Sequence, residues 1–378
     1  MPGIYLHIPF CHKACTYCDF HFSTNMKRKA EMVEAICQEI ERRKSFFPEN
    51  QLIDTIYFGG GTPSVLSEEE LDQIFSTLHQ YFSINPKAEI TLEANPDDLS
   101  PEKLEILKNA GVNRLSIGIQ SFFDRDLQWM NRSHNREEAI QCIKSAREVG
   151  INNISADLIF GLPHLSQEEW EANLRQMIDL EVNHLSLYAL TVEEKTFLNH
   201  QVKNGTTQIP DDSLYEKQFL FAHEFLATQG FDHYELSNYA RPGFHSQHNS
   251  SYWKGIPYLG LGPSAHSFDG KERSWNIANN QKYLTAISQN QTAITESETL
   301  TIKDLYHEYI MTHIRKKEGI DTEYIEKTFI RGWQKLYQSV IDHHLNEGNL
   351  TQENNVFRPT PEGWLISDQI IRDFFILE

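Results

Sequence analysis

Three cysteines, Cys11, Cys15 and Cys18, stand within eight residues directly after a short apolar run. Thiols at spacings of four and three suit an iron–sulfur cluster or zinc, because a bound metal stabilises the thiolate. Structural zinc sites usually combine two separated pairs of ligands, and here only His12 is at hand as a fourth ligand. Three cysteines alone leave one corner of a 4Fe–4S cube open. We therefore interpret the triplet as a cluster with an iron that can bind a substrate, and keep zinc as the alternative.

The remaining cysteines, Cys37 and Cys142, fall within stretches of helical periodicity. An odd total of five in a chain of this size argues against a disulfide framework. We expect both to be small buried apolar residues without a ligand role.

The charge balance excludes some classes of protein. The 378 residues include 53 acidic and 34 basic side chains, which gives a formal net charge of −19. Nonspecific attraction to nucleic acid or to an anionic membrane is therefore disfavoured as the main activity. No stretch approaches the ~18 apolar residues of a spanning helix, and the N-terminus lacks signal-peptide features. We expect a cytoplasmic protein with no transmembrane segment and no nucleic-acid partner.

The elements that must position the thiols follow a regular alternation in the first half of the chain. Six β-branched or aromatic runs alternate with amphipathic helical patterns, and Ser67, Ser100 and Ser166 stand where helix N-caps are expected. This spacing predicts right-handed βαβ units on a parallel sheet, and so an α/β partial (β/α)6 barrel. The expected strands are 4–9, 55–58, 89–93, 114–119, 154–160 and 184–190, and the expected helices are 27–46, 67–82, 101–110, 136–149 and 167–180.

Polar residues gather at the ends of these expected strands, where a parallel sheet places its ligand sites. A glycine run followed by Thr62 ends the second strand, and glycines let the backbone approach a ligand closely. Any one of these residues is more often a capping or paired group, but several on one edge favour a polar ligand. The residues are Gly59, Gly60, Gly61, Thr62, Glu93, Gln120, Arg132 and Asp157.

The pattern changes after about residue 195. We expect a loop at 199–210, a helix at 211–229, and then a stretch at 234–268 dense in Gly, His, Asn and aromatic residues. Helical patterns follow at 302–316 and 322–347, then a hairpin at 349–359 with Asn354 and Asn355 at its turn, and a last helix from Pro361. This predicts a partial barrel at 1–195, a barrel-completing region at 196–299, and a small winged-helix-like α+β domain at 300–378 for packing or partner docking.

The Cys-x3-Cys-x2-Cys motif after the first strand resembles the radical SAM superfamily, whose fold is a partial (β/α)6 barrel. The resemblance implies that Cys11, Cys15 and Cys18 hold a 4Fe–4S cluster and that exchangeable S-adenosylmethionine (SAM) binds the open iron through its amino and carboxylate groups. An electron from a low-potential donor, such as a flavodoxin or ferredoxin, then cleaves SAM to a 5′-deoxyadenosyl radical.

The fuller match is to the anaerobic coproporphyrinogen III oxidase family, and it covers nearly the whole chain. It is carried by residues 4–11, 59–64, 92–96, 113–122, 157–163, 234–240 and 360–363. Similarity implies a first SAM position lined by Tyr5, Gly60 and Glu93, with the backbone of Tyr17 near the cluster. An adjacent SAM position is implied for Gly61, Thr62, Gln120, Arg132 and Asp157.

Two features separate the branches of that family. The porphyrinogen dehydrogenases carry another cysteine two residues after the third ligand, where this chain has Phe20, and an N-terminal extension where this chain enters its first strand at Ile4. In both respects the chain resembles the HemW-like haem-chaperone branch, which implies that the region 196–299 binds haem. A motif associated with haem binding in that branch is His-Asn-x-x-Tyr-Trp, which here is His248, Asn249, Tyr252 and Trp253, and a Gly- and His-rich stretch at 258–268 follows it.

The chemistry of this motif is compatible with haem, because a neutral imidazole is a normal axial ligand and aromatic rings can cover a porphyrin face. On residue types alone, His248 hydrogen-bonded in a packed turn and Trp253 in a domain core are the more common arrangement. His245 and His266 are further candidates for an iron ligand. The resemblance is what favours the haem interpretation.

The resemblance implies a haem chaperone that binds haem and transfers it to an acceptor protein, with a membrane-associated acceptor as one candidate. The alternative is an oxygen-independent coproporphyrinogen III oxidase of porphyrin biosynthesis, so whether the chain is an enzyme stays open. A radical SAM methyltransferase is a third possibility, disfavoured because no extra cysteine for methyl relay lies near the motif. No catalytic residue is assigned.

Overall fold

A computed structural model describes residues 1–376, and its centre is a run of six parallel strands. They lie side by side in chain order, and each pairs in parallel with the next. This confirms the expected α/β fold and the six runs expected as strands. The strands are β1 Gly3–Ile8, β2 Leu52–Gly60, β3 Ser83–Ala94, β4 Arg114–Gln120, β5 Asn153–Phe160 and β6 His184–Ala189.

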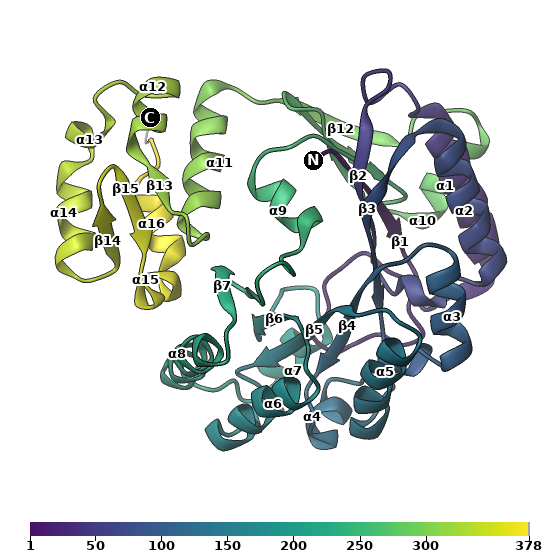
Figure 1. The fold of residues 1–378 in the computed structure, drawn as a ribbon, viewed down its shortest axis with the longest axis horizontal. Coiled ribbons are helices and arrows are strands. Elements are labelled where there is room, and N and C mark those ends of the chain that lie inside the picture. The colour runs from purple at the N-terminus through teal and green to yellow at the C-terminus, as the bar shows by residue number, and fades with distance from the viewer. Residues whose placement is uncertain (377–378) are drawn as a thin grey trace. The chain divides into compact units, whose positions relative to one another are not determined.

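Helices connect successive strands and cover the outer side of the sheet (Figure 1). The expected N-caps are confirmed, because the hydroxyls of Ser67, Ser100 and Ser166 accept hydrogen bonds from backbone N–H groups three residues on. The short α4 was absent from the sequence prediction. The helices are α1 Lys29–Arg42, α2 Glu68–Tyr81, α3 Pro101–Asn109, α4 Asp124–Trp129, α5 Arg136–Glu148 and α6 Gln167–Asp179, with single 3-10 turns η1 Met26–Arg28, η2 Pro63–Val65 and η3 Pro96–Asp98.

The sheet continues beyond β1 through residues that the sequence prediction left without strands. Strand β9 (Tyr258–Leu261) pairs in parallel with β1, and β10 (His266–Phe268) and β11 (Glu272–Asn276) continue antiparallel. Strand β12 (Ile294–Thr299) follows, after helix α10 (Asn280–Ser288). A side chain at Gly260 would overlap the backbone carbonyl of His266. Strands β9 to β11 have only three to five residues each, too few to show a clear alternation of apolar and polar residues, and β9 contains this glycine.

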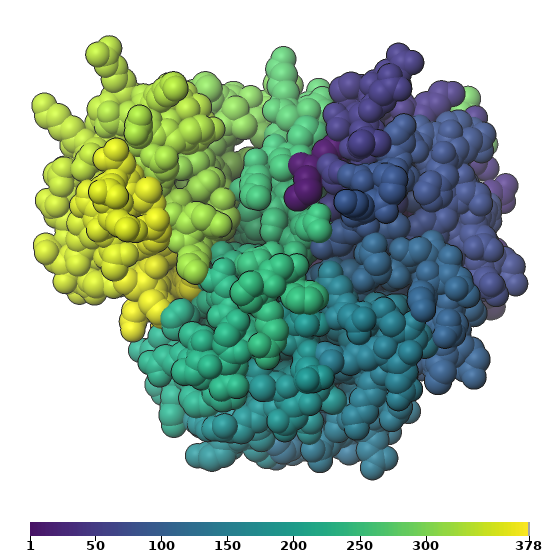
Figure 2. Space-filling view, viewed as in Figure 1, coloured from purple at the N-terminus to yellow at the C-terminus, as the bar shows by residue number. Residues whose placement is uncertain are grey.

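Two short helices lie in this first part of the chain. Helix α7 (Phe197–Lys203) occupies the start of the expected loop at 199–210, because Thr196 caps it by accepting from the backbone N–H of Asn199. The loop prediction was therefore wrong for its first residues. Helix α9 (Gln247–Trp253) contacts β2 on the inner side of the sheet (Figure 1). In the space-filling view, the N-terminal residues (purple) lie beside the green surface formed by the part of the chain that contains α9 and β9 (Figure 2).

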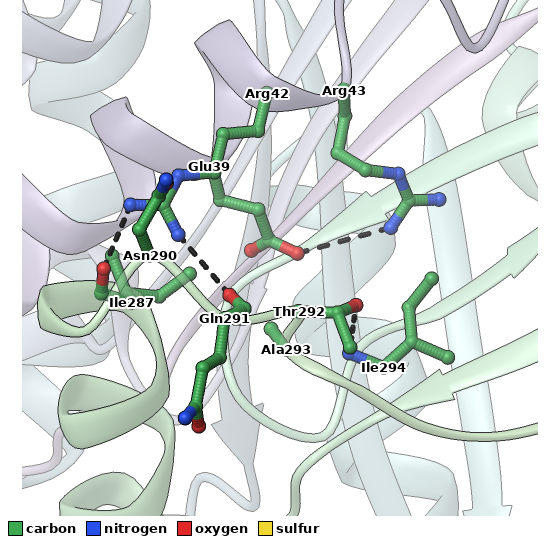
Figure 3. Close-up of a pocket in the computed structure, with 9 residues that line it drawn as sticks. All are labelled: Glu39, Arg42, Arg43, Ile287, Asn290, Gln291, Thr292, Ala293 and Ile294. Atoms are coloured by element: carbon green, nitrogen blue, oxygen red, sulfur yellow. Dashed lines mark hydrogen bonds and ion pairs between the residues drawn. The ribbon is translucent and has the colours of Figure 1, made fainter.

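A buried carboxylate joins α1 to the sheet extension. Glu39 is 2 % exposed and accepts hydrogen bonds from the Gly262 backbone N–H (2.8 Å), the Asn276 amide (2.8 Å) and the Tyr283 hydroxyl (2.7 Å). A cavity of about 200 Å³ lies beside it (Figure 3). In that cavity Arg42 donates to the Ile287 and Gln291 carbonyls, and so its guanidinium caps the end of α10.

The chain divides into two compact units, residues 1–210 with 246–298, and residues 211–245 with 299–378. The division expected at 195 and 299 stays a prediction. A bilayer-spanning helix needs a long apolar stretch, and none of the helices within residues 1–376 has one. The second unit contains α8 Asp212–Thr228, β7 Asp232–Glu235, β8 Asn238–Ala240, α11 Ile302–Ile314, β13 Ile320–Asp321, α12 Thr322–Thr328, α13 Trp333–Leu336, α14 Gln338–Asn346, β14 Leu350–Glu353, β15 Val356–Pro359, α15 Pro361–Leu365 and α16 Ser367–Asp373.

The C-terminal part follows the predicted order, with one correction. The helical stretch expected at 322–347 is three helices, because the chain turns at Gly332 in the left-handed region (φ +75°). The hairpin is confirmed, with Asn354 at its turn also left-handed (φ +54°). Trp333 is fully buried in the core of this unit and donates from its indole N–H to the Tyr306 hydroxyl (2.8 Å).

Candidate metal centre and ligand site

The three clustered cysteines occupy a loop that begins directly after β1. The loop closes on itself, because the Cys11 N–H donates to the Ser23 carbonyl (3.1 Å) and the Ser23 N–H to the Pro9 carbonyl (2.9 Å). At its centre, the Thr16 N–H donates to the Met130 carbonyl (3.1 Å), and the Thr16 carbonyl accepts from the first turn of α7 (2.8 Å). Strand β1, the segment after α4 and helix α7 therefore fix the backbone that carries the thiols.

The three thiols are free and partly exposed, and two of them accept hydrogen bonds. The Thr62 hydroxyl lies 3.2 Å from Cys11 Sγ, and an Arg132 guanidinium nitrogen lies 3.4 Å from Cys15 Sγ. Burial raises the pKa of Cys11 to about 11 and of Cys18 to about 12, and the neighbouring thiols add to both shifts. Because three thiolates this close repel one another, the set is suited to a positively charged group that replaces the protons. The donor set thus fits a metal cluster.

The zinc alternative depends on His12. This side chain is exposed, and its Nε2 lies 3.4 Å from a carboxylate oxygen of Asp98. Across residues 1–376, no group of three or more His, Cys, Asp or Glu side chains is arranged about a single ion. In this structure His12 is therefore engaged with Asp98 rather than placed as a fourth ligand.

The residues of the first implied SAM position come together on the inner side of β1, β2 and β3. A Cβ placed on Gly59 would lie 3.0 Å from the Tyr5 ring and 3.1 Å from Glu93 Oε1. Gly60 has φ +108°, and a Cβ there would lie 2.7 Å from the His7 ring, which the Tyr5 hydroxyl contacts at 3.3 Å. Burial raises the pKa of Glu93 to about 7. Gly60 therefore requires glycine, Gly59 is tightly surrounded by side chains, and both leave the backbone bare beside a carboxyl group.

The adjacent implied position is organised around Arg132. One guanidinium nitrogen donates to Asn95 Oδ1 and to the Gly118 carbonyl, both at 2.7 Å. Asn95 also donates to the Thr62 hydroxyl (3.4 Å), and a Cβ on Gly118 would lie 2.8 Å from Gln120 Nε2. The structure therefore brings Thr62, Gln120 and Arg132 together. Asn95 and Gly118 join them and were not assigned from the sequence, although both fall within stretches that carry the family resemblance.

Glycine is also required at Gly61. Its N–H donates to the Ile8 carbonyl (2.9 Å), and a Cβ there would lie 2.7 Å from the Phe10 carbonyl oxygen. The next residue, Thr62, donates from its N–H to the same Phe10 carbonyl (2.7 Å). This segment therefore packs its backbone directly against the start of the cysteine loop.

Two buried polar atoms at this edge of the sheet lack a partner among the described residues. Arg132 Nε and Asp157 Oδ1 are buried, and neither forms a hydrogen bond with any described residue. Burial raises the pKa of Asp157 to about 6. Gln120 has φ +67°, a left-handed conformation that is strained for a residue other than glycine. Unsatisfied donors and acceptors are costly in a folded protein, so they fit a ligand that supplies both an amino and a carboxylate group.

The predicted haem motif lies on α9, with its histidine fully enclosed. His248 is 1 % exposed, its Nδ1 lies 2.8 Å from the Thr55 hydroxyl, and its Nε2 lies 2.8 Å from the Tyr252 hydroxyl. Burial lowers its pKa to about 3, so the ring is neutral. Asn249 and Trp253 are half-buried. Both ring nitrogens of His248 are already hydrogen-bonded, as the packed arrangement expects, and its role toward haem stays a prediction.

Tyr57 links this motif to the implied SAM residues and was not noticed in the sequence. Its hydroxyl donates to Glu93 (2.8 Å), and its ring stacks on His248 with 5.0 Å between the ring centres. The sequence did contain one indication that Tyr57 belongs to the site. It stands two residues before Gly59, and residues two apart on a strand share a face of the sheet.

Of the other residues singled out in the sequence, Tyr17 lies in the cysteine loop and the rest lie outside it. Cys37 and Cys142 are buried in α1 and α5, as expected. Tyr17 is half-buried, and its hydroxyl interacts with Cys15. His245 belongs to the second unit and lies 3.2 Å from Asp232 Oδ2. His266 is exposed on β10.

Comparison with known proteins agrees with this arrangement. A family model described as the radical SAM superfamily matches residues 5–177, and one described as the HemN C-terminal domain matches residues 300–366. The structure resembles coproporphyrinogen III oxidase (HemN) from Escherichia coli, with a TM-score of 0.85, 23 % identity, and coverage of 99 % of this chain and 90 % of that one. At that identity the likeness shows the fold. Fold and cysteine loop together define a radical SAM protein, a class that implies a 4Fe–4S cluster and SAM.

The chain is also similar, over nearly its full length, to relatives that share one name. The heme chaperone HemW of Bacillus subtilis is 32 % identical, with 99 % of each chain covered. The heme chaperones HemW of Lactococcus lactis and of Escherichia coli are each 31 % identical, with 98 % of this chain and 97 % of each relative covered. The chain belongs to the HemW family.

Proposed function

We propose that the chain binds haem and transfers it to an acceptor protein, on a radical SAM scaffold. Full-length similarity to proteins named heme chaperone HemW carries this proposal. Phe20 supports it, because it stands, 70 % exposed, where the porphyrinogen dehydrogenases are expected to have a further cysteine.

Cys11, Cys15 and Cys18 hold the cluster in this proposal, each giving one thiolate to one iron. The bound cluster, supplied with an electron by a flavodoxin- or ferredoxin-like donor, provides reductive chemistry toward SAM. The Thr62 hydroxyl and the Arg132 guanidinium stabilise the thiolates through their hydrogen bonds to sulfur. The backbone of Tyr17 lies beside the cluster because it sits between two of its ligands.

Residues at the carboxyl ends of the strands bind SAM at two adjacent positions. The first position is lined by Tyr5, Gly60 and Glu93, and there Glu93 accepts a hydrogen bond from an amino or hydroxyl group. The adjacent position is lined by Gly61, Thr62, Gln120, Arg132 and Asp157, and there Arg132 Nε can donate a hydrogen bond and Asp157 Oδ1 can accept one. Since both of these atoms are buried without partners, occupancy of that position removes a desolvation cost.

Haem binding belongs to the first unit, and helix α9 contributes the motif of His248, Asn249, Tyr252 and Trp253 to its surroundings. The acceptor is a protein that lacks its haem, at the membrane or in the cytoplasm, and the chain itself acts in the cytoplasm. The strongly acidic composition does not oppose this proposal, because a porphyrin face binds by apolar contact.

An anaerobic haem titration with a transfer step tests the proposal. The reconstituted protein should shift the Soret band of added haem, and the loaded protein should give up that haem to a haem-free acceptor. If no spectral change accompanies titration of folded protein with an intact cluster, haem binding is disproved. If haem binds but never leaves to any acceptor, the chaperone role is disproved.

The cluster assignment has its own test. A triple alanine variant of Cys11, Cys15 and Cys18 should lose iron–sulfur absorbance after reconstitution, while a Cys37→Ala and Cys142→Ala double variant should keep it. Retained absorbance in the triple variant would overturn the assignment.

A further inference from the structure

The cavity beside Glu39 is lined by side chains from two parts of the first unit. Figure 3 shows Glu39, Arg42 and Arg43 at the end of α1, facing the segment that leads from α10 into β12. The volume of about 200 Å³ is smaller than the roughly 300 Å³ at which pockets for drug-sized ligands begin. A ligand that fits this cavity is therefore one small group with few further atoms.

Arg43 has hydrogen-bond donors in this cavity without an acceptor. Its guanidinium forms one hydrogen bond with the described residues, from Nη2 to the Ser267 hydroxyl at 3.3 Å. Its Nη1 is buried and donates to no described residue. The Arg43 guanidinium also lies over the Phe46 ring, 5.3 Å from the ring centre, which holds it in place. Because a buried donor without an acceptor is unfavourable, Nη1 is suited to an oxygen that a ligand supplies.

Glu39 does not meet this need. Its Oε1 lies 3.9 Å from Arg43 Nη1, which is an ion-pair distance and too long for a hydrogen bond. Its two oxygens already accept the three hydrogen bonds from Gly262, Asn276 and Tyr283 described above. The carboxylate is therefore held toward the sheet extension and cannot approach Arg43 more closely without giving up those bonds.

The side chains that line the cavity carry a net positive charge. Glu39 is the one acidic residue among them, and Arg42 and Arg43 outnumber it. Arg42 donates to the Ile287 and Gln291 carbonyls and to Gln38 Oε1, which leaves other N–H groups of its guanidinium free to donate. Since Ile287 is buried and apolar, the wall beside these cations screens their charge poorly. The cavity should therefore attract an anion.

The segment opposite α1 offers a further donor. The Thr292 hydroxyl accepts from the Ile294 N–H (3.1 Å), and its own hydrogen forms no hydrogen bond with a described residue. Thr292 is exposed, so it stands at the mouth of the cavity, as does the exposed Arg42. Guanidinium and hydroxyl donors around one small space match the oxygens of a phosphate or carboxylate group.

We propose that this cavity binds a small oxyanion, the phosphate or carboxylate group of a small molecule, with Arg43 as its main donor and Arg42 and Thr292 at the mouth. None of the lining residues belongs to the cysteine loop, to the SAM positions or to the motif on α9, so this site does not depend on the proposed haem binding. Arg43 bonds Ser267 of β10 and Arg42 bonds the end of α10. A bound oxyanion therefore links α1 to the sheet extension and stabilises the first unit.

Calorimetric titration of the full chain tests this site with inorganic phosphate, pyrophosphate and citrate, each at constant ionic strength. At least one of them should bind with a Kd of about 1 mM or lower, and the unfolding temperature should rise with its concentration. Arg43→Gln should weaken this binding about tenfold or more. Arg43→Lys keeps the charge without the planar fork and should weaken it by a smaller factor. Lys44→Gln removes the same charge from the next, exposed side chain and should bind as wild type.

The three anions identify the group that is bound. Binding of phosphate and pyrophosphate without citrate assigns a phosphate group, and binding of citrate alone assigns a carboxylate. The site is overturned if none of the three binds to wild-type protein at about 10 mM, or if Arg43→Gln binds as Lys44→Gln does. If Arg43→Gln does not fold, Arg43→Lys decides the matter, because wild-type affinity in that variant would contradict the role of the Arg43 fork.

Discussion

At the residue scale, the burial of His248 has a consequence for stability. Its two hydrogen bonds come from Thr55 and Tyr252, and no spacing in the sequence predicts the bond to Thr55. The pKa of His248 falls from 6.5 to about 3 in the folded chain, so at intermediate pH the unfolded chain binds a proton there that the folded chain does not. Its contribution is therefore present above pH 6.5 and is lost as the pH falls, by about 2 kcal/mol between about pH 8 and about pH 5. Urea unfolding at both pH values should show this loss diminished in His248→Gln. The matched variant His79→Gln should follow wild type, and a wild-type-like slope in His248→Gln would contradict the buried neutral ring.

Gly61 gives a prediction about the cysteine loop. A methyl group there would lie 2.7 Å from the Phe10 carbonyl oxygen and 2.8 Å from the Phe10 nitrogen, both of them backbone atoms that cannot swing away. Gly61→Ala should therefore displace the loop and cut iron–sulfur content per chain by about half or more after reconstitution, an effect of about 1–3 kcal/mol of steric strain. Gly205→Ala meets open space but carries backbone strain at φ +70°, so it should lose stability while keeping its cluster, and it serves as the control for a general loss of stability. Full cluster content in Gly61→Ala would show that the close approach is not required.

At the element scale, the six central strands and their crossover helices could be predicted because hydrophobic runs and N-caps recur at regular spacing. Strands β9 to β12 could not be predicted, since they are short and join the sheet only through β9, which contains a glycine and pairs with β1 across more than two hundred residues. Helix α7 was hidden by the polar composition of 199–210, although Thr196 was present as a cap.

The attachment of α1 to this sheet extension depends on Glu39. In Glu39→Ala the Gly262 N–H, the Asn276 amide and the Tyr283 hydroxyl lose a buried acceptor, which should cost about 3 kcal/mol of unfolding free energy. Thermal or urea unfolding measures this, and Glu39→Gln should lose less because it keeps an oxygen acceptor. Glu34→Ala on the exposed side of the same helix should be neutral. A loss equal in Glu39→Ala and Glu34→Ala would show that these three hydrogen bonds do not anchor the helix.

At the scale of the whole molecule, the chain has two compact units with separate cores, and the cysteine loop lies in the first. The second core contains Trp333, whose indole N–H bonds the Tyr306 hydroxyl. Trp333→Ala should cost that unit about 3–5 kcal/mol and speed hydrogen exchange in α11 and α16, while iron–sulfur absorbance stays at the wild-type level. Leu336→Ala removes an exposed side chain nearby and should change neither. Loss of the cluster in Trp333→Ala would contradict separate cores.

We propose that this radical SAM protein handles haem and does not oxidise porphyrinogen. One reconstituted anaerobic sample, with SAM and an electron donor, is divided between a haem titration and incubation with coproporphyrinogen III. We expect a shifted Soret band that saturates with added haem, and no protoporphyrinogen IX. Formation of protoporphyrinogen IX, with a haem spectrum identical to that of free haem, would contradict the proposed haem-chaperone function.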